Sequence, residues 1–96
     1  MKIEDFLMTG KEHAVSRDSL TVQLNLPDRT IRRLIQEARD RGALIMNAGD
    51  GTGYYISDDI GEIHRQYRVD KSRALSILKR LKTMRQMLKD AGVDVR

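Results

Sequence analysis

Arginine and glutamine side chains recur along one side of the segment 28–41. At about 100° per residue, Arg29, Arg33 and Gln36 fall on a common face, with Arg32 beside them. Guanidinium and carboxamide groups can form paired hydrogen bonds with the edges of guanine and adenine. The opposite face has the i, i+3, i+4, i+7 spacing of a buried stripe, through Ile31, Leu34, Ile35 and Ala38. The pattern predicts a helix that is apolar on one side and suited to nucleic acid on the other, although a solvated surface helix would carry similar charges.

The ends of this helix are marked by residues with positional preferences. Pro27 suits a first helical turn, and Asp28 can cap the helix or meet the positive end of its dipole. Gly42 follows two nearby arginines, which is typical of a helix end. We therefore expect the helix to occupy most or all of residues 28–41.

A second, shorter helix is predicted just before it. Ser16 has the side chain and the place of an N-cap, and Arg17 lies in the first turn. The helix is expected to end near Asn25, which tolerates the left-handed conformation needed there. Leu26 is a lone apolar residue that can fill the angle between the two helices. Helix, short turn with an apolar centre, and helix make the helix-turn-helix arrangement.

The chain before these helices is expected to begin with a short helix over residues 3–9. Ile3, Phe6 and Leu7 share one of its faces, and Phe6, the only phenylalanine, is interpreted as a core anchor. Residues 13–15 are predicted to be a short extended piece that leads into the next helix.

A glycine-rich segment joins two predicted strands after the helices. We expect strands at 43–47 and 54–57, linked by residues 48–53 as a β-hairpin. A phosphate-binding loop is a weaker interpretation, because such a loop needs a helix after it and usually a lysine. In a hairpin, the glycines allow close approach to a phosphate backbone, and the Thr52 hydroxyl offers a contact. The second strand opens with two tyrosines, of which one should pack inward and the other face outward.

This order of elements, with two short motifs, resembles the winged helix-turn-helix family. Asp28-Arg29-Thr30-Ile31-Arg32-Arg33-Leu34-Ile35 resembles the opening of that family's recognition helix, and Gly53-Tyr54 resembles the pair that closes its wing. The closest form is the N-terminal domain of biotin-operon repressors and of many small phage and plasmid regulators. The resemblance covers residues 3–57, with one departure at Pro27, where a serine cap is common. It implies a mainly α fold with a small antiparallel hairpin, binding duplex DNA through its second helix in the major groove.

The predicted DNA contacts are of three kinds. Base contacts are assigned to the exposed face of the second helix, namely Arg29, Arg33 and Gln36. Phosphate contacts are assigned to Ser16, Arg17, Thr30 and Arg32, and a contact from the wing to Thr52. The whole predicted interface is Ser16, Arg17, Asp28, Arg29, Thr30, Arg32, Arg33, Gln36, Thr52 and Tyr54. The expected biology is transcriptional regulation or an accessory role in phage or plasmid replication.

The basic excess lies entirely in the last third of the chain. Residues 1–60 hold 8 Lys/Arg and 10 Asp/Glu, whereas residues 61–96 hold 10 Lys/Arg and 4 Asp/Glu. Two domains are expected, a winged helix at 1–57 and a helical extension at 58–96. In the extension we expect a helix from Asp58 and Asp59, a break near Val69 and Asp70, and a longer helix starting at Asp70 or Ser72.

The longer helix carries an apolar stripe with coiled-coil-like spacing, through Ala74, Ile77, Leu81, Met84, Leu88 and Ala91. Four basic residues flank it, namely Lys79, Lys82, Arg85 and Lys89. The stripe could pack on its own domain or pair with a second copy of the chain. We expect a homodimer, held by Ile77, Leu81, Met84 and Leu88.

Catalytic and metal sites find little support in the sequence. There is no cysteine, and the two histidines, His13 and His64, are far apart. We therefore expect no enzyme, no metal, no cofactor and no small-molecule substrate. No apolar run approaches about 20 residues and no signal-peptide pattern is present, so a cytoplasmic protein without a membrane span is expected. The negative charge of residues 1–60 leaves one rival open, a winged helix that binds proteins instead of DNA.

Overall fold

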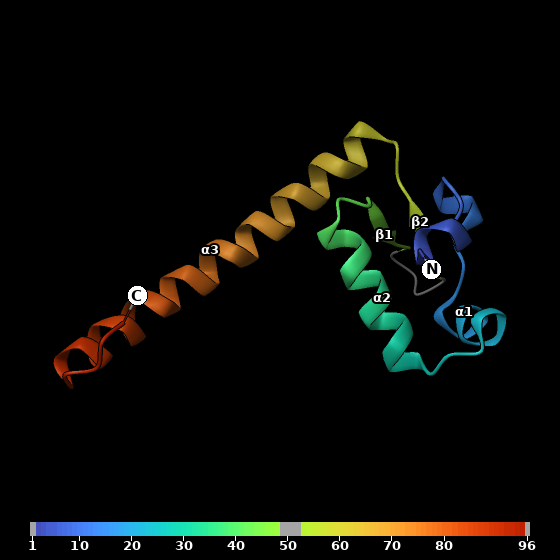
Figure 1. The fold of residues 1–96 in the computed structure, drawn as a ribbon. Coiled ribbons are helices and arrows are strands. Elements are labelled where there is room, and N and C mark those ends of the chain that lie inside the picture. The colour runs from blue at the N-terminus through green and yellow to red at the C-terminus, as the bar shows by residue number, and fades with distance from the viewer. Residues whose placement is uncertain (1, 49–52, 96) are drawn as a thin grey trace. The chain divides into compact units, whose positions relative to one another are not determined.

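The computed structural model describes residues 2–48 and 53–95 (Figure 1). In these ranges the protein is mainly helical with one small antiparallel sheet, as the sequence predicts. Its elements are the 3-10 helices η1 (Ile3–Phe6) and η2 (Lys11–His13), the α-helices α1 (Arg17–Leu24), α2 (Asp28–Asp40) and α3 (Ile60–Asp90), and the strands β1 (Ile45–Asn47) and β2 (Tyr54–Ile56). The chain divides into two compact units, residues 1–63 and residues 64–96.

The core of the first unit forms around the apolar stripe of α2. Ile31 and Ile35 are 0 % and 2 % exposed, so the predicted buried face is confirmed. Other elements of the unit supply the covering side chains, which include Ile3, Leu7, Leu20 and Ile45. Because α1, the η1 segment and β1 each contribute to this one cluster, burial of the stripe holds α2 in a defined orientation in the unit.

The ends of the two α-helices show which residues set them. The Ser16 hydroxyl accepts a hydrogen bond from the backbone N–H of Ser19 at 3.0 Å, so it is the predicted N-cap of α1. Asn25 ends α1 in the left-handed conformation, with φ of 53°. Pro27 holds the N-cap place of α2 in an extended conformation, without a side-chain cap. Asp28 is therefore the first helical residue and does not cap the helix, which leaves its carboxylate for other partners.

The small sheet is extended by single residues on its second edge. β1 pairs with β2, with Met46 opposite Tyr55. On the other side of β2, Val15 and Tyr54 exchange two backbone hydrogen bonds of 2.9 and 2.8 Å. Tyr55 is buried beside Met46 and Ala48, as expected of the inward tyrosine. Tyr54 is half-buried and packs against the core cluster of α2, so the prediction that the second tyrosine faces outward is wrong. Val15 thus links the chain before α1 to the hairpin after α2.

Gly53 is required by this close approach. Its φ is +126°, and a Cβ at this position would lie 2.0 Å from the carbonyl oxygen of Val15. A side chain there would collide with backbone atoms, which have little room to move. The glycine before Tyr54 therefore permits a close contact inside the protein.

Three predictions for the N-terminal segment differ from the structure. The first helix is a 3-10 helix that ends at Phe6 and does not extend to residue 9. Leu7 then takes an extended conformation and enters the core, whereas Phe6 is 40 % exposed and is not the expected anchor. In the segment predicted to be extended at 13–15, His13 belongs to η2, and only Val15 bridges a strand.

The prediction of a helix break near Val69 and Asp70 is also wrong. α3 runs without interruption from Ile60 to Asp90, and residues 62–91 contain neither glycine nor proline. The Asp70 carboxylate accepts a hydrogen bond from the Gln66 side chain at 2.9 Å, one turn earlier. This i, i+4 hydrogen bond stabilises the helix at Asp70, where the apolar periodicity is interrupted.

The first turn of α3 belongs to the first unit and is held there by polar contacts. Asp59 caps the helix, because its carboxylate accepts from the backbone N–H groups of Gly61 and Glu62 at 2.8 and 3.2 Å. The Glu62 carboxylate accepts from the hydroxyls of Tyr55 and Ser57 at 2.7 and 2.9 Å. Ser57 is buried, so this acceptor satisfies a hydroxyl that water does not reach.

Candidate nucleic-acid interface

The exposed face of α2 has its basic and acidic side chains at different ends. Arg29, Arg32 and Arg33 lie in the N-terminal half and are exposed. Glu37 and Asp40 lie in the C-terminal half and are also exposed. A helix that enters the major groove of DNA contacts base edges mainly with its N-terminal residues. The arginines therefore occupy the half of α2 where a phosphate-rich ligand would be attracted.

The individual side chains of this face differ in their hydrogen-bond and ion-pair partners. The Gln36 carboxamide donates a hydrogen bond to Asp40 at 3.1 Å, and the Arg33 guanidinium lies 3.8 Å from the Glu37 carboxylate. Both contacts are exposed and span one helical turn, so they are weak and exchangeable. Within the described parts of the chain, the Arg29 side chain makes no hydrogen bond or ion pair, and its guanidinium is available to a ligand.

Asp28 gathers two arginines at the start of α2. One carboxylate oxygen accepts from Arg17 Nε at 2.5 Å, and the other lies 3.1 Å from Arg32 Nε. Each guanidinium uses its Nε in this contact, which leaves terminal nitrogens for other acceptors. Asp28 belongs to the predicted DNA-binding set, and here its carboxylate joins the first turn of α1 to the first turn of α2. We define the Asp28 clamp as Asp28, Arg17 and Arg32.

Tyr54 connects the Asp28 clamp to the sheet. Hydrogen bonds with Tyr54 and with Asp28 raise the pKa of Arg17 above its ordinary value, so this side chain stays charged. The Arg39 guanidinium lies over the Tyr54 ring, 5.9 Å from its centre, and Arg39 Nε donates to the carbonyl oxygen of Ile45 at 3.0 Å. Arg39 has no signal in the sequence, because no local spacing relates it to a tyrosine fifteen positions further along the chain.

The other predicted DNA-binding residues have different surroundings. The Ser16 hydroxyl is used by its capping bond, although it keeps a lone pair. Thr30 is half-buried in the first turn of α2. Thr52 lies outside the described residues. The structure thus brings together Arg17, Asp28, Arg32 and Tyr54, and leaves Arg29, Arg33 and Gln36 side by side on the exposed face of α2.

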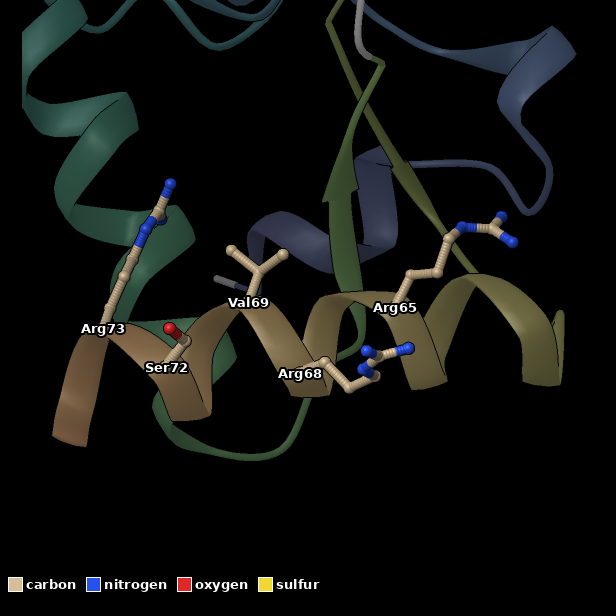
Figure 2. Close-up of a pocket in the computed structure, with 5 residues that line it drawn as sticks. All are labelled: Arg65, Arg68, Val69, Ser72 and Arg73. Carbon is tan, nitrogen blue, oxygen red and sulfur yellow. The ribbon is translucent and has the colours of Figure 1, made fainter. Parts of the chain in front are cut away.

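The second unit offers a basic surface of another kind. A shallow hollow along α3 is lined by Arg65, Arg68, Val69, Ser72 and Arg73 (Figure 2). Figure 2 shows that all five residues belong to one helix and that the three guanidinium groups point in different directions. Because the charges do not converge on one point, the hollow is not a built anion site.

Comparisons with protein-family models, with curated proteins and with solved structures gave no match to this chain. No cluster of three or more His, Asp or Glu in the described ranges is placed to hold a metal ion. In the same ranges, no helix is both long enough and apolar enough to cross a membrane.

Proposed function

We propose that the protein binds duplex DNA as a winged helix-turn-helix, with the N-terminal half of α2 in the major groove. The observation that carries the proposal is the exposed group Arg29, Arg32 and Arg33 on a helix whose opposite face is buried. Arginine is the side chain most often used for bidentate contacts with guanine. A helix anchored over its whole apolar face can present these groups without further ordering.

The arrangement of elements supports the same proposal. The helices α1 and α2 meet through a turn in which Asn25 is left-handed, and the β1–β2 hairpin follows α2. This is the order that the family resemblance implies, with the hairpin in the place of the wing. The Val15–Tyr54 backbone pairing fastens the hairpin beside α1. Thr52, which lies outside the described residues, is proposed to touch the phosphate backbone.

Each basic side chain of the proposed interface has an assigned role. Arg29 and Arg33, with Gln36 beside them, face the base edges. Arg17 and Arg32 contact phosphates through the nitrogens that the Asp28 clamp leaves open. In this assignment Asp28 is a positioning residue, since it orients the two guanidinium groups that reach the DNA. Glu37 lies toward the end of α2 that leaves the groove, where its charge opposes the phosphates least.

The test begins with the intact chain and a pool of random duplex DNA at low salt. Bound sequences are selected, and affinity for the selected site is compared between the native protein, Arg33→Ala and Lys11→Ala. Arg33→Ala should weaken binding to the selected site by about 1–3 kcal/mol and relax its base preference. Lys11→Ala removes the same charge from the exposed η2 segment and should change affinity by less than about 0.5 kcal/mol.

The alternative outcomes are distinct. Equal weakening on every sequence would assign Arg33 to phosphate contact, because only base contacts discriminate. A folded protein that binds no duplex at low salt would refute the proposal. The remaining function for the first unit would then be a protein-interaction module, which the excess of acidic over basic residues in positions 1–60 favours. A role in transcription or in replication of a mobile element follows only if specific binding is found.

A further inference from the structure

The C-terminal helix carries a run of positive charge with no acidic residue in it. Between positions 71 and 89 there are seven basic side chains and no aspartate or glutamate: Lys71, Arg73, Lys79, Arg80, Lys82, Arg85 and Lys89. This stretch lies wholly within α3, in the second unit. We propose that it binds an acidic amphipathic helix of another protein. The proposal goes beyond DNA binding and does not depend on it.

An apolar seam runs along the same stretch, defined by Ala74, Ile77, Leu81, Met84 and Leu88. Its members alternate three and four residues apart, the spacing that places side chains on one line for pairing with a second helix. Ile77, Leu81, Met84 and Leu88 are 47 %, 49 %, 54 % and 41 % exposed. An exposed stripe of large apolar side chains marks an interaction site in a water-soluble helix.

The charges lie on both flanks of the seam, in the positions that decide partner choice. At about 100° per residue, Lys71 and Arg85 fall on one side of the seam, and Arg73 and Arg80 fall on the other. Residues in these places meet the flanking residues of a partner helix. A partner with glutamate or aspartate on both of its flanks would pair with all four. Charge complementarity therefore specifies the chemistry of the occupant.

A second copy of this chain fits the seam less well. In a register that aligns the two seams, parallel or antiparallel, two copies would bring together two stretches of seven basic residues each. Neither stretch contains an acid that could form an interhelical ion pair. Like charges on facing helices repel each other, which disfavours association with a partner of the same charge. The charge pattern thus favours an acidic partner over the homodimer expected from apolar spacing alone.

Lipid and nucleic acid are also poorer occupants. Helices that lie in a membrane interface use aromatic residues on a broad apolar face, and Tyr67 is the last aromatic residue of the chain. Phosphate backbones attract the basic residues but would leave the apolar seam exposed to water. Only an amphipathic helix with acidic flanks satisfies the seam and its charges together.

The experiment uses the intact chain and two synthetic peptides. Both peptides have the same leucine and isoleucine seam, and one has glutamate at every flanking position where the other has lysine. Binding is measured by calorimetry, and helix formation by circular dichroism. The acidic peptide should bind with Kd on the order of micromolar and the basic peptide at least about tenfold more weakly. Added salt should weaken the acidic complex.

Charge-reversal variants test whether the flanks decide the choice. Arg80→Glu combined with Arg85→Glu should reverse or abolish the preference for the acidic peptide. At about 100° per residue, Lys79 does not flank the seam as expected from its place in the sequence, but lies with Arg65 on the opposite side of the helix. Arg65→Glu combined with Lys79→Glu therefore makes the same change in net charge away from the seam and should leave the preference in place. Leu81→Asp should abolish binding of both peptides, because it puts a charge in the seam.

Three results would overturn the proposal. The first is equal affinity for the two peptides. The second is a dimer of the intact chain, seen by sedimentation at concentrations on the order of tens of micromolar and lost in Leu81→Asp, with no peptide binding. The third is binding to phosphatidylserine vesicles or to duplex DNA that Leu81→Asp abolishes, again with no peptide binding. Absence of DNA binding by α2 leaves the peptide result unaffected, so the two proposals fail separately.

Discussion

Two helices of this protein have apolar stripes of similar spacing, but one stripe is buried and the other is exposed. In α2, Ile35 is 2 % exposed, whereas Leu81 in the middle of the α3 stripe is 49 % exposed. The α2 stripe is buried because side chains of α1, η1 and β1 pack against it. Apolar periodicity therefore predicts which face of a helix is apolar, and the other segments of the chain determine whether that face is buried.

The charges of the two regions differ in the same way. In the first unit, several arginines have acidic partners, as in the Asp28 clamp and in the contact of Arg41 with both carboxylate oxygens of Glu4 at 2.8 and 3.1 Å. Residues 71–89 have basic side chains and no acidic ones. The paired charges of the first unit therefore fix local geometry, whereas the basic side chains of residues 71–89 have no acidic neighbour in their own stretch.

The largest expected effect comes from placing a charge in each stripe. Ile35→Asp should cost several kcal/mol and unfold the first unit, because a buried carboxylate without a partner is strongly unfavourable in a domain with about 5–15 kcal/mol of stability. Leu81→Asp should change stability by less than about 0.5 kcal/mol. Thermal melting followed by circular dichroism compares them. Equal destabilisation by both substitutions would show that the α3 stripe is covered in solution.

A smaller effect is expected from two glycines with positive φ. Gly53→Ala places a Cβ against the carbonyl oxygen of Val15 and should cost about 3 kcal/mol or more. Gly92 has φ of +81° and open space around it, so Gly92→Ala should cost no more than about 1–2 kcal/mol at the end of α3. Urea unfolding followed by tyrosine fluorescence provides the comparison. An unaffected Gly53→Ala protein would mean that the Val15 pairing is dispensable.

The smallest effect is expected from acid. A backbone N–H, followed by the Arg41 guanidinium, holds the pKa of Glu4 below its usual value of 4.5. A lowered pKa in the folded state adds stability above the usual value, and this stability is lost as the pH falls through the lowered pKa. Between about pH 5 and pH 3, the melting temperature of the native protein should fall more steeply than that of Arg41→Gln. Parallel curves would show that the Glu4–Arg41 pair contributes nothing to acid sensitivity.

Several features followed from the sequence because their signals are local. The N-cap at Ser16, the left-handed Asn25 and the buried stripe of α2 each depend on residues within one or two helical turns. The hairpin is signalled in the same way, by alternation and glycine within a few positions. The identity of the exposed face of α2 was predictable too, since it is the complement of the stripe.

Other features were decided by tertiary structure, because they join residues far apart in the chain. The partners of Arg17 and Arg39, the exposure of Phe6 and the requirement for glycine at position 53 depend on where other segments arrive. The uninterrupted α3 also could not be predicted from the apolar pattern alone. A gap in that pattern ends a helix only where the backbone or the packing prevents the helix from continuing. Short-range spacing determines faces and ends, whereas pairing and burial depend on contacts that only the folded chain makes.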